Sequence, residues 1–319
     1  MEIRRFGDTD LRVTPIGFGL AAVGRPAYIT SGRAHDLGPE RSARALERRS
    51  HELLDAAYGS GVRYFDVARS YGSAEEFLAS WLKLRAPADV RIGSKWGYTY
   101  VGAWRMDADV HEVKDHSLAA LERQFAESRK ILGSHLDLYQ IHSATLESGV
   151  LEDRAILAEL VRIGTEGIVI GLTVSGPRQA DVIRRALEVS VDGVNPFRSV
   201  QATWNLMERS AGDALGEAHD AGWGVIVKEA LANGRLTDPG APEALRRLAS
   251  VRGASADRIA IAAALAQPWS DVVLSGAVTV AQLESNVRAL DVTVEPGELA
   301  ELAEPPDVYW AERSARPWE

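Results

Sequence analysis

Three short apolar runs of the chain each end in an ionisable residue, and a tyrosine follows the first of them. These residues are Asp66, Lys95, His142 and, shortly after Asp66, Tyr71. A carboxylate at the end of a buried strand is costly to desolvate unless a cation meets it, and Lys95 is the candidate cation. We therefore expect the four side chains to form one site above one sheet.

The chemistry open to these residues is proton transfer to and from a carbonyl oxygen. A free tyrosine has a pKa near ~10, and a neighbouring ammonium lowers that pKa because it stabilises tyrosinate. If Asp66 keeps Lys95 charged, Tyr71 becomes a proton donor and acceptor. A neutral His142 can then orient the carbonyl oxygen. None of these groups supplies a hydride, so a redox reaction at this site requires a cofactor.

The composition is that of an ordinary globular protein, with 319 residues of which 46% are hydrophobic and 25% charged. A net charge of −9 argues against nucleic acid or an anionic membrane as partner. No apolar run approaches the roughly 20 residues that span a bilayer. The lack of cysteine excludes disulfides and thiolate metal sites and, with no apolar leader at the N-terminus, favours a cytoplasmic protein. We predict no metal site, because His111 and His116 would not share a face of the expected helix.

Short apolar strands alternate with amphipathic helices along most of the chain, which is typical of a parallel sheet covered on both faces. The expected strands are Ile16–Gly19, Val62–Asp66, Val90–Lys95, Leu136–His142, Gly167–Val174, Ser199–Asn205, Gly224–Glu229 and Asp271–Leu274. The expected helices are Ala43–Ser60, Ala74–Leu84, Val110–Leu132, Asp153–Thr165, Arg178–Val189, Gly212–Ala221, Ser255–Gln267 and Ala281–Leu290.

Eight such strands without a break in composition predict an α/β fold of the closed (β/α)8 type, the TIM barrel, as a single domain over residues 1–319. A β-hairpin (Ile3–Phe6 and Leu11–Thr14) precedes the barrel, and a tail (296–319) rich in aromatic residues follows it. The loop 24–42 is too long for a simple connector and is expected to be functional. Because catalytic groups of such barrels lie at the carboxyl ends of strands, the four residues share the expected active-site face.

The segments that carry these residues resemble the catalytic segments of the aldo-keto reductases. They are Asp66–Gly72, Ser94–Trp96 and Leu138–His142, and the similarity extends in order through Ile170–Ser175, Val200–Leu206 and Gln282 with Asn286. The resemblance covers nearly the whole chain. It implies Tyr71 as general acid/base, Lys95 and Asp66 as the groups that tune it, and His142 as the group that polarises the carbonyl. A nicotinamide cofactor would exchange hydride with the carbonyl carbon of an aldehyde, ketone or sugar.

The same resemblance suggests the cofactor contacts. Gln201 matches the position that holds the nicotinamide carboxamide, and Lys228 stands where many members place an aromatic residue under the nicotinamide ring. Arg235 is a candidate for the pyrophosphate. The full expected set is Gly19, Asp66, Ser143, Thr173, Ser175, Gln201, Lys228, Arg235, Gly276, Gln282 and Asn286. The resemblance favours NADP(H) as the cofactor. NAD(H) stays open, because the nearest cation to the segment 275–286, which resembles the one that binds the adenosine end of the cofactor, is Arg288.

Four aromatic residues on strand-end loops or in the tail are candidates for walls of a pocket for a small-molecule carbonyl or alcohol: Tyr28, Trp96, Trp104 and Trp310. Two other functions stay open. One is a regulatory protein that keeps the barrel and the cofactor with little turnover. The other is a barrel hydrolase or aldolase in which Lys95 forms a Schiff base. The sequence does not specify the oligomeric state.

Overall fold

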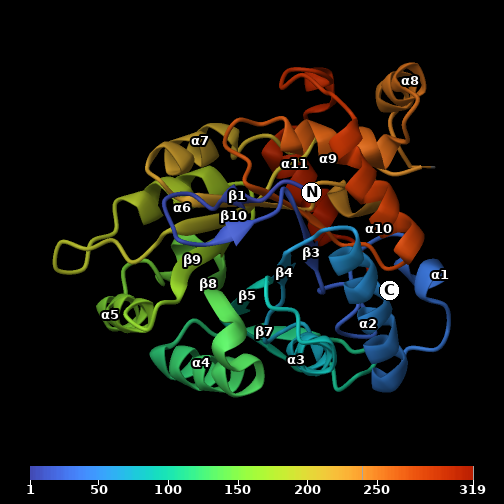
Figure 1. Ribbon diagram of the computed structural model, residues 1–319. Coiled ribbons are helices and arrows are strands. Elements are labelled where there is room, and N and C mark those ends of the chain that lie inside the picture. The colour runs from blue at the N-terminus through green and yellow to red at the C-terminus, as the bar shows by residue number, and fades with distance from the viewer. Residues whose placement is uncertain (239, 319) are drawn as a thin grey trace.

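Eight parallel strands close into a barrel in the computed structural model, which describes residues 1–238 and 240–318 (Figure 1). Neighbouring strands follow chain order, and the last pairs with the first through Val273 and Ile16. The predicted TIM barrel is thus confirmed. Its strands are β3 (Ile16–Gly19), β4 (Tyr64–Asp66), β5 (Arg91–Trp96), β8 (Leu136–Ala144), β9 (Val169–Val174), β10 (Ser199–Thr203), β11 (Gly224–Lys228) and β12 (Val272–Ser275).

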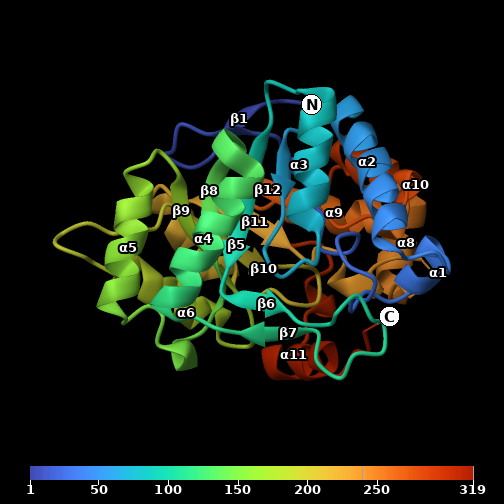
Figure 2. The same cartoon turned by 90° about the horizontal axis from the view of Figure 1, so that it is seen from below.

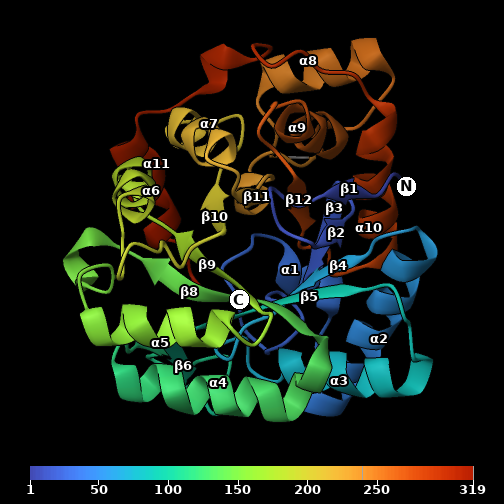
Figure 3. The same cartoon turned by 60° about the vertical axis from the view of Figure 1, so that its left-hand side comes forward.

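Helices surround the barrel, as α3, α4 and α5 do in Figure 3. Their buried apolar side chains pack with those of the strands in one core. Ser42 and Ser117 cap α2 and α4 by accepting hydrogen bonds from backbone amides three residues ahead. The helices are α1 (Arg33–Leu37), α2 (Ala43–Gly59), α3 (Ala74–Arg85), α4 (Leu118–Leu132), α5 (Arg154–Gly164), α6 (Gln179–Leu187), α7 (Gly212–Asp220), α8 (Glu243–Arg252), α9 (Ala256–Leu265), α10 (Val280–Val287) and α11 (Pro306–Ser314). No helix in the described part of the chain is long and apolar enough to cross a membrane.

The predicted N-terminal hairpin closes the amino end of the barrel. Its strands β1 (Arg4–Arg5) and β2 (Arg12–Val13) pair antiparallel, and Phe6 between them stacks on Tyr64 with 6.4 Å between ring centres. A side chain on Gly224 would meet the Phe6 ring at 2.5 Å, so the packing of Phe6 requires that glycine. This end of the barrel therefore contributes to stability, as expected for the amino face of such a barrel.

The opposite end carries β6 (Tyr98–Tyr100) and β7 (Glu112–Lys114), which pair antiparallel, and also α11; all three lie at one end of the barrel in Figure 2. The helix predicted over Val110–Leu132 is wrong in its first part, because residues 112–114 pair with β6 and the helix begins only at Leu118. The cap at Ser117 fixes that start. Two short helices, α1 in the long loop and α8, were not predicted, and α11 occupies the tail.

Candidate active site

Lys95 and Asp66 form an ion pair at the carboxyl ends of β4 and β5. The ammonium of Lys95 donates to Asp66 Oδ1 and, at 3.0 Å, to the carbonyl oxygen of Val67. Gln201 from β10 donates to the other carboxylate oxygen at 2.9 Å. Both charged side chains are at most 3% exposed, so removal of either would leave a buried charge without its partner. The amine of Lys95 is engaged by two acceptors, which weighs against Lys95 as a Schiff-base nucleophile.

Tyr71 lies directly over this ion pair in the loop between β4 and α3. The loop turns at Gly72, which has a φ of +62° and packs against the carbonyl of Gly24, where a side chain would collide at 2.4 Å. The Tyr71 ring centre is 4.9 Å from Lys95 Nζ. The His142 ring stands edge-on to it, at 5.5 Å between centres and an angle of 83°. The structure thus brings the four predicted residues together.

Arg25, which the sequence did not point to, completes this cluster. Its guanidinium is 1% exposed and lies 5.4 Å from the centre of the Tyr71 ring. It donates to the carbonyl oxygen of Ser70 at 2.8 Å and pairs with Glu112 of β7 at 2.7 Å. A single arginine in a long loop has no sequence pattern, and only the fold reveals its position beside the tyrosine.

Burial dominates the acid–base properties of the two central rings. It raises the pKa of Tyr71 well above its usual value, the charge of Asp66 adds to the rise, and Arg25 opposes it. The net shift of the Tyr71 pKa is therefore opposite in direction to the lowering expected from an adjacent ammonium. Burial also lowers the pKa of His142 far below its usual value, and Lys95 and Arg25 lower it further. His142 is therefore a neutral imidazole, as polarisation of a carbonyl requires.

The orientation of His142 is set by its neighbours. Its Nδ1 lies 3.4 Å from the Ser70 hydroxyl, its backbone carbonyl accepts a hydrogen bond from His116 Nε2 at 2.9 Å, and its ring packs on Tyr98 at 5.0 Å. When Ser70 donates to Nδ1, the proton of the neutral ring resides on Nε2. His116 and Tyr98 were not predicted as site residues, because the β6–β7 hairpin that presents them was not predicted.

Hydroxyl groups and an ammonium gather at the ends of the next strands, where several cofactor contacts were predicted. Lys228 donates to Thr203 Oγ1 at 2.8 Å and to Ser175 Oγ at 3.2 Å. Ser175 lies 3.2 Å from the Ser143 hydroxyl, and Thr173 accepts from the Ser143 amide at 2.7 Å. Burial lowers the pKa of Lys228 to about 8. Lys228 and these hydroxyl groups thus give this end of the barrel a polar character.

The remaining predicted cofactor residues lie in two other places. Gly19 ends β3 beside Asp66, whereas Gly276, Gln282 and Asn286 lie at the end of β12 and on α10. Arg235 is held by Glu304 at 3.0 Å and by Glu312 of α11 at 3.1 Å. Its charge is therefore already compensated by the C-terminal segment, and its predicted contact with a pyrophosphate stays a prediction.

The four aromatic residues predicted to wall a pocket differ in position. Trp310 lies 5.8 Å from Lys228 Nζ and Tyr28 lies 5.1 Å from the guanidinium of Arg25, so both border the site. Trp96 is fully buried against His116, at 5.6 Å between rings. Trp104 packs on Phe77 of α3 at 6.4 Å and donates to the carbonyl of Arg41.

The C-terminal segment covers the site. Arg313 of α11 pairs with Glu229, whose side chain is 8% exposed. Burial alone would raise the pKa of Glu229, but Arg313 and Lys228 lower it to about 2. Trp318 stacks on His111 at 4.4 Å and 7° and lies 4.6 Å from the guanidinium of Arg25. The tail (296–319) was expected to lie over the active-site face, and its described part does. Trp318 belongs to this tail but was not among the predicted site residues.

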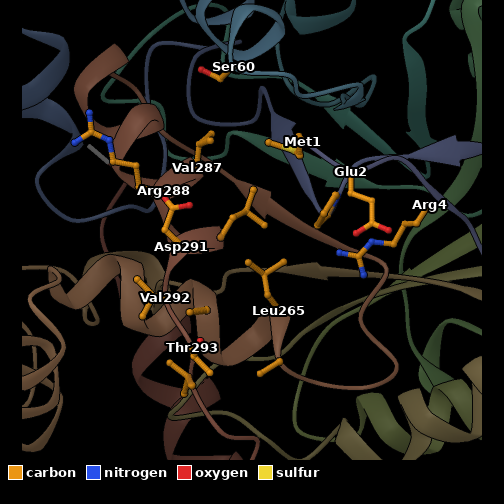
Figure 4. A pocket seen from close by; sticks show the side chains of 16 residues that line it. Met1, Glu2, Arg4, Ser60, Leu265, Val287, Arg288, Asp291, Val292 and Thr293 are labelled. Atoms are coloured by element: carbon orange, nitrogen blue, oxygen red, sulfur yellow. The ribbon is translucent and has the colours of Figure 1, made fainter.

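A cavity of about 670 Å³ lies at the other end of the barrel (Figure 4). Met1, Glu2, Arg4, Leu265 and Arg288 are among its lining residues. Arg288 is thereby placed away from the catalytic cluster. Among the described residues, no group of three or more metal-ligating side chains is arranged to hold an ion.

Comparison with known proteins decides the family. The model of the aldo/keto reductase family matches residues 15–305. The chain belongs to this family. L-Galactose dehydrogenase of Arabidopsis thaliana is 27% identical over 310 residues, which cover 91% of this chain and 88% of that protein. L-Glyceraldehyde 3-phosphate reductase of Escherichia coli K12 is 24% identical over 344 residues, which cover 95% of this chain and 91% of that protein.

Solved aldo-keto reductases share the fold. The holo form of aldo-keto reductase AKR11C1 from Bacillus halodurans has a TM-score of 0.72 and 22% sequence identity, with 96% of this chain and 97% of that chain covered. This aldo/keto reductase is therefore an oxidoreductase of the class that interconverts carbonyls and alcohols.

Proposed function

We propose that this aldo/keto reductase interconverts a small-molecule aldehyde, ketone or sugar with its alcohol, using Tyr71 as general acid/base and a bound nicotinamide dinucleotide. One observation carries the proposal: the Tyr71 ring lies over the Lys95–Asp66 pair, with the neutral His142 edge-on to it. A phenol, an ammonium and an imidazole at one point are suited to moving a proton at a carbonyl oxygen.

The residues around this point fit the cofactor. Gly276 at the end of β12 leaves open space where a side chain would stand. Asn233, in the loop after β11, is 7% exposed and its Oδ1 has no hydrogen-bond partner in the structure. Next to the catalytic cluster, Ser143, Ser175 and Lys228 offer donors suited to a carboxamide. When bound there, the nicotinamide supplies the hydride that none of these side chains can provide.

In the direction of carbonyl reduction, the substrate oxygen lies between Tyr71 and His142. His142 donates from Nε2 and polarises the carbonyl, because Nδ1 faces Ser70. Tyr71 then transfers its phenolic proton to the oxygen as negative charge develops on it. The ammonium of Lys95, 4.9 Å from the ring centre, and the guanidinium of Arg25 stabilise the tyrosinate that remains. The same groups act in reverse order during alcohol oxidation.

A substrate panel tests this proposal. The protein is mixed with aldehydes, ketones and sugars in the presence of NADPH or NADH, and the loss of absorbance of the reduced cofactor is followed. The proposal expects turnover of at least one class of carbonyl compound. Without a carbonyl compound, the reduced cofactor should not be oxidised. Binding of a dinucleotide without turnover of any carbonyl would contradict the proposal and favour a regulatory protein.

A further inference from the structure

The loops at the end of the barrel offer a candidate place for the phosphate groups of a dinucleotide, an inference that rests on the proposed function. TIM barrels commonly bind phosphate groups with the loops after their seventh and eighth strands and with the N-terminus of a nearby helix. Here those elements are the loops after β11 and β12 and the start of α10. The open position at Gly276 and the unpaired, buried Asn233 Oδ1 lie in these loops.

Gln282, on the first turn of α10, is fixed in one orientation. Its Oε1 accepts hydrogen bonds from the amides of Val278 at 3.0 Å and Thr279 at 3.3 Å. These two bonds complete a capping box with Thr279. The amide nitrogen of Gln282 must then point away from the helix, and it donates to Asp36 Oδ2 at 2.6 Å. A carboxylate from α1 thus lies beside the first turn of α10, on the side chain of Gln282.

The hydrogen-bond partner of Asp36 is the neutral amide of Gln282. None of the ion pairs found among the described residues includes Asp36. Arg49 is the cation beside this helix start, but it donates to the carbonyl of Val278 at 3.1 Å and lies 3.5 Å from Glu52. Arg288, the cation expected from the sequence, lines the cavity at the other end of the barrel (Figure 4).

We propose that Asp36 selects NAD(H) over NADP(H), in place of the NADP preference expected from the sequence. A carboxylate next to the adenosine ribose accepts a hydrogen bond from a free 2′-hydroxyl, which is a recurring device of NAD-binding sites. The 2′-phosphate of NADP would place a second anion against Asp36, and like charges at close range repel strongly where water is partly excluded. Asp36 is therefore a specificity-determining residue for the cofactor.

The test is a binding titration that needs no substrate. NADH and NADPH are titrated into the wild type and into Asp36→Asn while tryptophan fluorescence is recorded, at low and at high salt. Asparagine keeps an oxygen for Gln282 and removes the charge. Glu40→Gln is the matched control, because Glu40 is an exposed carboxylate in the same loop that bonds only locally to the Ser42 amide. Asp36→Ser serves as a second variant if asparagine disturbs the loop.

The expected result is that the wild type binds NADH at least about tenfold more tightly than NADPH, and that Asp36→Asn gains about tenfold in NADPH affinity, more at low salt. Glu40→Gln should behave as the wild type does. Tighter binding of NADPH than NADH by the wild type, or no gain in either Asp36 variant, would overturn the role of Asp36 and leave the proposed function intact. If neither dinucleotide binds, the proposed function itself fails.

Discussion

Arg25 lies against Tyr71, with 5.4 Å between its guanidinium carbon and the centre of the phenol ring. Burial and Asp66 raise the pKa of Tyr71, and Arg25 opposes that rise. The cation that tunes the proposed general acid/base therefore comes from the long loop before α2, in addition to Lys95 from the barrel.

We predict that Arg25→Met moves the ionisation limb of the pH–kcat profile for alcohol oxidation to higher pH. The reason is that alcohol oxidation requires the deprotonated phenol, and the variant loses a charge that stabilises it. Arg25→Lys, which keeps a cation, should shift the limb less. Equal shifts in the two variants would show that Arg25 acts through packing rather than charge.

A second prediction concerns the stability of the Lys95–Asp66 pair. Lys95→Met leaves the carboxylate of Asp66 buried without its cation, so the free energy of unfolding should fall by about 3–5 kcal/mol. The double variant Lys95→Met/Asp66→Asn removes both charges and should regain much of that loss. Urea denaturation followed by tryptophan fluorescence measures both. A double variant no more stable than Lys95→Met would contradict the coupling.

Glu229 and Arg313 should make the protein less stable in acid. The folded-state pKa of Glu229 is lowered to about 2 from 4.5, so its contribution is complete above pH 4.5 and is lost as the pH falls towards 2. Relative to Glu229→Gln, the wild type should lose about 1.4 kcal/mol of unfolding free energy for each pH unit below 4.5. Urea titrations at pH 6 and pH 3.5 test this. A difference between the two proteins that does not change with pH would refute it.

Lys228 should also make the stability rise with pH, but in the alkaline range. Burial lowers its folded-state pKa to about 8 from 10.5, so between these values the unfolded chain binds more protons than the folded one. The wild type should therefore gain stability relative to Lys228→Met as the pH rises from 8 to 9.5, by about 2 kcal/mol. Denaturation curves for the two proteins at both pH values provide the measurement. Parallel behaviour would mean that the ammonium is solvated rather than buried.

The barrel and the four central residues were predictable from sequence for one physical reason. In a parallel barrel the carboxyl ends of all strands lie on the same face. Residues that end apolar runs, such as Asp66 and Lys95, can therefore be predicted to lie close together without knowledge of long-range contacts. Their catalytic roles stay predictions, since the structure shows position and environment rather than turnover.

The rest of the site depends on contacts between distant segments. Residues 112–114 were expected to be helical because their pairing with Tyr98–Tyr100 has no local signature. Trp318 contacts Arg25 although almost the whole chain separates them in sequence. No sequence pattern predicts a contact between residues so far apart. The bond between Asp36 and Gln282 joins a loop to a helix that comes much later in the sequence. Such pairs become visible only after the tertiary structure is known.

The proposed mechanism depends on Tyr71 as the group that carries the proton, and Tyr71→Phe is its sharpest test. Phenylalanine keeps the ring against His142 and Lys95 and removes only the hydroxyl. On the best carbonyl substrate of the panel, the variant should lose about 10²–10⁴-fold in kcat, while fluorescence titration gives a nearly unchanged Kd for the cofactor. A variant that turns over at the wild-type rate would contradict the mechanism.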